Sequence, residues 1–340
     1  MTHSPRIDWV DYAKGISIIL VVMMHATLST EAALGASGWL HPVVEFAKPF
    51  RIPAFFLIAG LFAARGMTKP WRTFIDSKVL HFAYFYVLWL TIQFLFRGPV
   101  YAVEDGALET LGQYLLAFID PFGTLWFIYL LPVFFVVTRL TRGLPPALVL
   151  IAAALLEAAP IATGWTLIDE FAGRFVYFFA GYLFGRWIVT HAEWFRTNPA
   201  TTTAMLAGWG IITAACVSAG VATWPGVSLA LGFIGAAAVI AISVLMARAG
   251  MLGGIRYCGQ NSIVIYLAFF LPMIATRIAL TKTELIVDPG LIAALVTLVA
   301  VVTPLILHRI VRGTAFAFLF ERPARFRLHT NKKPTLQPAE

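Results

Sequence analysis

Charged side chains are scarce in this sequence. Asp, Glu, Lys and Arg make up 12% of its 340 residues, and 60% of the residues are hydrophobic. Soluble domains average about 25% charged residues, so this composition excludes an ordinary soluble protein. The apolar residues fall into long runs, and a run that crosses a bilayer as a helix bonds its backbone polar groups within its own segment. We therefore predict an all-α integral membrane protein that crosses the bilayer several times.

Several chemical signatures are also missing. The two cysteines, Cys216 and Cys258, lack CxxC spacing, so neither a thiolate metal site nor a disulfide framework is indicated. There is no Gly-rich phosphate loop, no Gly-x-Ser-x-Gly sequence and no paired-histidine spacing. We therefore expect no metal and no bound cofactor. The net charge of +8 does not indicate a nucleic-acid partner, because the basic residues do not gather on one soluble face.

Ten apolar segments are predicted to cross the bilayer, which takes about 20 helical residues each. They are 12–30, 43–64, 79–96, 123–138, 144–162, 171–189, 201–221, 227–247, 261–279 and 290–308. With both termini in the cytoplasm, most of the 25 Lys and Arg residues fall in inside loops, as the positive-inside rule requires. We expect residues 1–310 to form one membrane domain and residues 311–340 to form a basic cytoplasmic tail at the lipid surface. The long outside connection holds an amphipathic piece near residues 108–119, which we expect on the outer surface.

The second apolar segment is short and is preceded by polar residues. Its clean apolar part, residues 52–64, is about 20 Å long as a helix, whereas the bilayer core is about 30 Å thick. The charged and helix-breaking residues before and at its start are Glu45, Lys48, Pro49, Arg51 and Pro53. Irregular backbone at membrane depth is tolerated where it lines a cavity, which predicts a broken helix. The alternative is a short span with an interfacial lead-in.

The first segment carries a histidine inside an apolar run. His25 follows Lys14 by eleven positions, which places both side chains on one helix face, about 20° apart and about 16 Å apart along the axis. An ionisable group in hydrocarbon is a functional-site candidate. Arg51 lies at the same outer level, and a nearby cation favours the neutral imidazole that a general base needs. The alternative is a core histidine bonded to a neighbouring backbone group or hydroxyl.

Basic residues also gather in the inside loop after the second segment. Asp76 is the one acidic residue among Arg65, Lys69, Arg72, Lys78 and His81. Lys78 and His81 are three positions apart, so on an α-helix they share a face. Such a cluster can bind a phosphorylated donor from the cytoplasm. The positive-inside bias is the other explanation for part of it.

Further polar groups lie near the outer ends of later segments. Glu157 ends the fifth segment and Arg174 begins the sixth, so the two either pair or mark an extracytoplasmic pocket. Asp120 and Trp126 stand at the outer mouth of the fourth segment. A tryptophan at this depth is more often an interfacial anchor than a sugar platform. Together with Arg51, these residues are the candidates for an acceptor-side pocket.

Four short motifs occur in order along the chain. They are Asp11-Tyr12-Ala13-Lys14-Gly15-Ile16 with His25, Pro53-Ala54-Phe55-Phe56-Leu57-Ile58-Ala59-Gly60, Leu125-Trp126-Phe127, and Gly259-Gln260-Asn261-Ser262-Ile263-Val264-Ile265-Tyr266. Together they resemble the membrane proteins of acyltransferase family 3, over about residues 5–310. The Lys form of the first motif, in its Tyr-Ala-Lys-Gly context, is similar to the branch that includes fucose 4-O-acetylase-like proteins.

The resemblance implies transfer of an acyl group, usually acetyl, from cytoplasmic acyl-CoA to a hydroxyl of an extracytoplasmic carbohydrate or related acceptor at the bacterial inner membrane. It implies that His25 is catalytic with Lys14 as its motif partner. It also implies that a basic Arg-x-x-Arg pair contacts CoA. That place is taken here by Lys78 and His81, with Arg65 and Arg72 nearby. Many members also have histidine where this chain has Arg51, and histidine near Phe269.

Two other classes of function fit the same features. A transporter or flippase of a lipid-linked or small polar substrate would also contain broken helices and a histidine at membrane depth. An inert membrane partner in polysaccharide assembly would need no Arg pair. Binding of acyl-CoA and release of CoA separate the enzyme from both alternatives.

Overall fold

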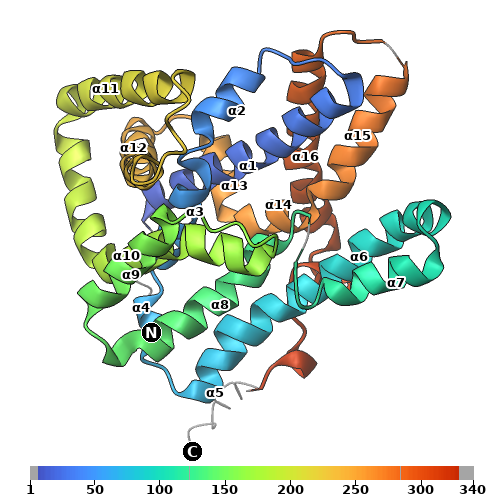
Figure 1. Ribbon diagram of the computed structural model, residues 1–340, viewed down its shortest axis with the longest axis horizontal. Helices are drawn as coiled ribbons and strands as arrows, with labels where there is room; N and C mark the ends of the chain where they lie inside the picture. The colour runs from blue at the N-terminus through green and yellow to red at the C-terminus, as the bar shows by residue number, and fades with distance from the viewer. Residues whose placement is uncertain (1–6, 122, 284, 329–340) are drawn as a thin grey trace, which may run out of the picture.

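The structure is a computed structural model that describes residues 7–121, 123–283 and 285–328, and within them every regular element is a helix. The first half contains α1 (Asp8–Leu34), α2 (His41–Ala47), α3 (Arg51–Gly60), α4 (Ala64–Met67), α5 (Trp71–Phe74), the π-helix η1 (Ile75–Leu80), α6 (His81–Glu104), α7 (Ala107–Leu116), α8 (Trp126–Leu140), the short 3-10 turn η2 (Thr141–Gly143) and α9 (Pro146–Ala158). The second half contains α10 (Thr166–Thr197), α11 (Pro199–Ser218), α12 (Val227–Ala249), α13 (Gly253–Gln260), α14 (Ser262–Ala268), α15 (Phe270–Thr283), α16 (Pro289–Val311) and the 3-10 turns η3 (Ala315–Leu319) and η4 (Ala324–Phe326). Figure 1 shows their arrangement.

The chain is a multi-span membrane protein. Within the described residues, six helices are long and apolar enough to cross a bilayer, or seven if the bent pair α14–α15 counts as one span. Each of the ten predicted segments coincides with a helix or a helix pair, but α3 and α9 are short. All-helical architecture is therefore confirmed, whereas ten crossings and two cytoplasmic termini stay predictions.

The predicted break in the second segment is confirmed. Helix α2 ends at Ala47 and α3 begins at Arg51, with a turn over residues 48–50 between them. Pro49 has no backbone N–H to continue the helical hydrogen bonds. A second break separates α14 from α15, whose axes differ by 55°. The break at Phe269 is buried, whereas Lys48 in the first break is exposed and borders an outer cavity together with Pro49.

Helix α1 runs through the middle of the bundle and packs against α13, α16, α12 and α3. Its closest approach is to α13, where a Cβ atom on Gly259 would clash with the carbonyl of Asp11, and one on Gly15 would clash with the carbonyl of Ile255. Small residues let helix backbones approach closely in a membrane. The first and fourth sequence motifs are therefore packed directly against each other.

Helix α3 is held by a similar contact on its other side. A Cβ atom on Gly60 would clash with the carbonyl of Phe178, and one on Gly181 would clash with the carbonyl of Leu57. Next to this α3–α10 contact, the ring centroids of Phe56 and Phe134 are 4.9 Å apart. The second motif thus lies between α1 and α10, fixed by backbone proximity and by aromatic packing.

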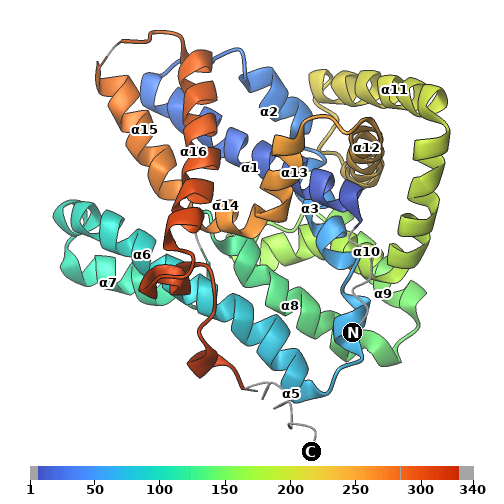
Figure 2. The same ribbon diagram turned by 180° about the vertical axis from the view of Figure 1, so that it is seen from behind.

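The described part of the C-terminal segment packs on the helix bundle. Arg322 donates to the side chain of Asp76 in η1, with an N–O distance of 2.8 Å, and the backbone N–H of Leu328 donates to the same carboxylate. Tyr84 of α6 donates to the carbonyl of Phe318. Figure 2 shows this segment crossing α6 toward α5. The described residues of this segment thus contact α6 and η1. The predicted division at residue 310 stays a prediction, and residues 329–340 lie outside the described residues.

Candidate functional site

Two cavities lie one after the other along α1. The first, here called the lysine chamber, has a volume of about 220 Å³ and is lined by Lys14, Lys78, Ser262 and mostly apolar side chains. The second, here called the histidine chamber, has a volume of about 210 Å³ and contains His25 and Arg51. The eleven-residue spacing from Lys14 to His25 thus places one residue in each chamber.

Packing around the start of α1 sets the position of Lys14. The Tyr12 hydroxyl donates to the carbonyl of Met251 at 2.7 Å, and the side chain of Gln260 donates to Asp11 at 3.2 Å. These bonds join α1 to α13 and the segment before it. With the close backbone approach at Gly15, they fix the rotation of α1, so that Lys14 faces the lysine chamber.

Lys78 enters the lysine chamber from the opposite side. It lies in the π-helix η1, and its Nζ is 4.4 Å from the centre of the Phe135 ring. A cation over an aromatic face is stabilised without a carboxylate partner. The rest of the wall is largely aromatic and aliphatic. The lysine chamber therefore combines two amines with an apolar interior, which suits an anionic molecule that carries an apolar arm.

The other predicted donor-side residues lie outside this cavity. Arg65 and Arg72 are exposed on α4 and α5. The His81 ring packs edge-on against Phe82 and Phe85, with centroid distances of 5.4 Å and 5.1 Å. Lys78 lines the lysine chamber and His81 does not. The i→i+5 bonding of η1 changes the angular spacing on which the shared face was predicted, so that shared face stays a prediction.

Arg51 reaches the histidine chamber because of the break between α2 and α3. Its side chain is only 9% exposed, and Nη1 donates to the carbonyl of Val44 in α2 at 3.0 Å. Its Nε is buried and has no hydrogen-bond partner among the residues that the structure describes. The guanidinium therefore supplies positive charge at the cavity and keeps a donor that is not used by the described protein groups.

His25 lines the same chamber, and its ring centroid is 5.6 Å from that of Phe269. No hydrogen bond to its ring nitrogens is found within residues 7–121, 123–283 and 285–328. The alternative of a core histidine bonded to a neighbouring backbone group is therefore not what the described residues form. An imidazole beside a buried cation stays in the neutral form that accepts a proton.

Two further charged residues complete the histidine chamber. Arg174 and Glu170, one helical turn apart on α10, form an ion pair with an N–O distance of 3.1 Å, and both line the cavity. Glu170 was not among the predicted residues. Arg174 also borders an outer cavity of about 430 Å³ together with Glu157. Of the two sequence alternatives for Glu157 and Arg174, the shared pocket fits the structure, since Glu157 instead accepts from the Tyr177 hydroxyl at 3.2 Å.

Asp120 and Trp126, both predicted at the outer mouth of the fourth segment, differ in their relation to the histidine chamber. Trp126 lines the histidine chamber. Asp120 does not line it, and its carboxylate accepts a hydrogen bond from the backbone N–H of Leu167 at 3.2 Å. Leu167 lies in the first turn of α10, where backbone N–H groups have no partner within the helix. Asp120 therefore joins the connection after α7 to α10 instead of facing the cavity.

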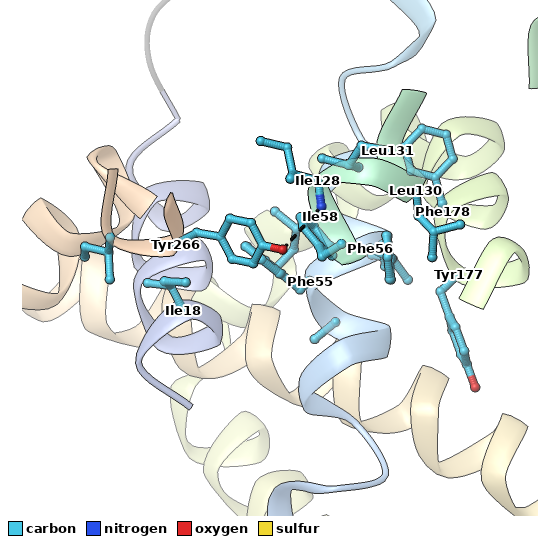
Figure 3. Close-up of a cluster of buried hydrophobic side chains, with 14 of the residues drawn as sticks. Ile18, Phe55, Phe56, Ile58, Ile128, Leu130, Leu131, Tyr177, Phe178 and Tyr266 are labelled. Carbon is cyan, nitrogen blue, oxygen red and sulfur yellow. Dashed lines mark hydrogen bonds between the residues drawn. The ribbon is translucent and has the colours of Figure 1, made fainter. Parts of the chain in front are cut away.

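Three aromatic side chains form a wall shared by both chambers, namely Phe55, Phe127 and Tyr266. Phe55 and Phe127 stack with ring centroids 4.5 Å apart, and Phe127 contacts Tyr266 edge-on at 5.5 Å. Figure 3 shows Tyr266 extending from α14 toward Ile128. Its hydroxyl donates to the carbonyl of Thr124 at 2.5 Å and accepts from the Ile128 N–H at 3.3 Å.

The arrangement is suited to proton transfer and anion binding. Within the described residues, no group of three or more His, Cys, Asp or Glu side chains is placed to hold a metal ion. The histidine chamber offers a proton acceptor beside buried positive charge, and the lysine chamber offers two amines. A reaction that takes an activated group from an anionic carrier to a hydroxyl needs both features.

Comparison with known proteins shows the family of this chain. The sequence model of the family described as "Acyltransferase domain" (acyltransferase 3) matches residues 7–309. The chain is also 25% identical over 208 residues to the inner membrane protein YcfT of Escherichia coli (strain K12), which covers 54% of this chain and 57% of that protein. The chain thus matches little more than half the length of this relative, and no solved structure matches it. Because the family match covers nearly all of the chain, this protein belongs to acyltransferase family 3.

Proposed function

We propose that this protein is a bacterial inner-membrane O-acyltransferase. It takes an acyl group, acetyl in the simplest case, from cytoplasmic acyl-CoA and transfers it to a hydroxyl of an extracytoplasmic carbohydrate or related acceptor. The acyl carbon gains a bond to the acceptor oxygen and loses its bond to the CoA sulfur. The hydroxyl proton ends on the departing thiolate, so the products are an ester and CoA.

One observation carries this proposal. Lys14 and His25 lie on one face of α1, and each lines its own chamber. The lysine chamber accepts the anionic carrier with its apolar arm, and the histidine chamber receives the acyl group and the acceptor. Under the predicted topology, the lysine chamber is on the cytoplasmic side, where acyl-CoA is made.

His25 acts on the reacting atoms in one of two ways. It removes the proton of the acceptor hydroxyl as a general base, or it takes the acyl group itself and passes it on from the imidazole nitrogen. Arg51, with a buried Nε aimed at no described protein group, stabilises negative charge that develops on the acyl oxygen. Both routes need a neutral imidazole.

The test measures release of CoA by the purified full-length protein and O-acylation of envelope glycans in cells that express it. His25→Ala is compared with His191→Ala, because His191 is exposed on α10 and lines neither chamber. We expect His25→Ala to lose both activities and His191→Ala to keep them. Glycan acylation that is unchanged in His25→Ala would remove the proposed role of this residue.

A transporter remains the alternative that specific features favour. Broken helix pairs such as α2–α3 and α14–α15 are common around transport sites. A transporter would neither bind acetyl-CoA nor release CoA from it. Binding of acetyl-CoA to the purified protein, measured by calorimetry, therefore separates the two functions before any acceptor is known.

A further inference from the structure

The wall between the chambers collects residues from three separate motifs. Phe55 belongs to the motif at residues 53–60, Phe127 to the motif at 125–127 and Tyr266 to the motif at 259–266. The remaining motif supplies Lys14 on one side of this wall and His25 on the other. All four motifs thus supply residues that line the two chambers along α1, and three of them form the wall between these chambers.

The wall is well supported on both sides. Tyr266 is buried, and its hydroxyl is hydrogen-bonded to the backbone on both sides of Phe127, at Thr124 and at Ile128. Phe127 in turn stacks on Phe55, which is anchored in the tightly packed helix α3. Because these three rings line both chambers, a group that passes from the lysine chamber to the histidine chamber meets them on its way.

The space beyond the wall is small. The histidine chamber measures about 210 Å³, whereas pockets for drug-sized ligands measure roughly 300–1,000 Å³. It must hold the acyl group and the acceptor hydroxyl at the same time. A long acyl chain would have to pass the rings first and would then fill the volume that the acceptor needs.

We propose that the wall formed by Phe55, Phe127 and Tyr266 determines which acyl groups reach His25, by admitting short acyl groups and excluding long ones. This inference rests on the proposed function and adds the class of donor to it. Phe55 and Phe127 supply the bulk that excludes long chains. Tyr266 is a positioning residue, because its two backbone hydrogen bonds hold the position of the Phe127 ring.

The experiment compares donors of different length in inverted membrane vesicles that carry the cell's own glycans. Acetyl-CoA, butyryl-CoA and octanoyl-CoA, each radiolabelled in the acyl group, are supplied in turn, and label in the glycans is counted. We expect the wild-type protein to prefer acetyl over octanoyl. In Phe127→Ala and Phe55→Ala we expect this preference to fall by about tenfold or more, the scale on which shape selects apolar groups.

The matched control is Phe82→Ala. Phe82 lines the lysine chamber but is not part of the shared wall. Its replacement by alanine therefore enlarges the lysine chamber and leaves the wall between the chambers intact. We expect its donor preference to stay within about twofold of the wild type, the scatter of near-neutral substitutions. A preference that is unchanged in Phe127→Ala and Phe55→Ala, with acetyl transfer retained, overturns the inference and leaves the proposed function intact.

Two further measurements keep the proposal testable if an alanine variant folds poorly. Phe127→Leu and Tyr266→Phe should shift the donor preference in the same direction by about threefold, since less bulk or one hydroxyl is lost. Separately, Met24→Cys, in a protein with Cys216 and Cys258 replaced by Ala, places a thiol in the histidine chamber. A membrane-impermeant maleimide added on the cytoplasmic side should label it only when the wall is opened. Equal labelling with and without the wall would overturn the inference.

Failure of the proposed function gives a different result. If no acyl-CoA of any length yields label in glycans or free CoA with the wild-type protein, the function itself is wrong and the inference falls with it. If acetyl is transferred and only the length preference fails to respond, the function stands and the wall does not select the donor.

Discussion

The two chambers differ in how their charge is placed. In the lysine chamber, the amines of Lys14 and Lys78 stand in a mostly apolar wall. In the histidine chamber, His25 is surrounded by a buried guanidinium and by the Arg174–Glu170 ion pair. An apolar wall with a few cations suits an anionic carrier with a long arm, whereas dense polar groups suit the orientation of a hydroxyl-rich acceptor. One helix face therefore borders two chemically different environments.

The largest expected effect separates chemistry from donor binding. His25→Ala should lower acyl transfer by about 10²- to 10⁴-fold, the usual contribution of a general base. Because His25 lines only the histidine chamber, the dissociation constant for acetyl-CoA should stay within about twofold of the wild type, as for a substitution that removes no donor contact. Calorimetry and CoA release are measured on the same preparation. Loss of acetyl-CoA binding in this variant would show that the two chambers are not independent.

A smaller effect is expected at the other cation of the histidine chamber. Arg51→Met should lower the maximal transfer rate by about ten- to hundredfold, which corresponds to the loss of a charged hydrogen bond. The KM for acyl-CoA should not change.

Arg277→Met is the matched control for Arg51→Met. Arg277 also donates to a backbone carbonyl, that of Ser29 at 3.1 Å, but lines neither chamber. Each substitution removes a hydrogen bond to a backbone carbonyl and should lower the thermal stability of the protein. Only Arg51→Met should also lower the transfer rate. Equal losses of rate in the two variants would assign the effect of Arg51 to folding alone.

Substitution in the lysine chamber should change the KM for acyl-CoA and not the maximal rate. Lys78→Ala is expected to raise the KM for acyl-CoA by about fivefold, since a partly exposed ion pair contributes about 1 kcal/mol or less. The maximal rate should hold. Lys69→Ala removes an exposed amine of the same loop that does not line the chamber, and its KM should stay close to that of the wild type. A similar rise of KM in both variants would indicate that acyl-CoA is attracted by the overall positive charge of this segment and not by Lys78 in particular.

The smallest effect is expected at Asp120. Asp120→Asn keeps an oxygen that accepts from the Leu167 N–H, so acyl transfer should change by less than about twofold. Asp120→Ala leaves that N–H without its partner and should lower the midpoint of thermal unfolding instead. A large loss of acyl transfer in Asp120→Asn would instead support the sequence-based prediction that Asp120 belongs to the acceptor-side pocket.

Local signals in the sequence were sufficient for several features of the fold. The prolines and charges at residues 45–53 predicted the break between α2 and α3, and the apolar spacing near residues 108–119 predicted helix α7. The stripe of Lys14 and His25 follows from helical periodicity alone. These features depend on residues close together in the sequence, where the geometry of one helix decides the outcome.

Long-range packing accounts for what the sequence did not predict. The shared wall joins Phe55, Phe127 and Tyr266 from three distant segments, and no periodicity relates them. The Arg322–Asp76 ion pair joins residues 246 positions apart. Lys78 lines the lysine chamber from a π-helix, which has no reliable signature in composition. Side-chain direction in a connection, as at Asp120, likewise depends on which helix end lies nearby.

Under the proposed function, the unbroken course of α1 limits the kinds of donor that fit this protein. Because Lys14 and His25 lie on one continuous helix, the distance between their positions is fixed at about 16 Å by the helical rise. It cannot shorten without breaking backbone hydrogen bonds. A donor whose anionic part stays near Lys14 must therefore span that distance with a flexible arm to bring its carbonyl to His25. Compact activated donors such as acetyl phosphate, in which the anion adjoins the acyl group, cannot do so, and we expect them not to replace acyl-CoA.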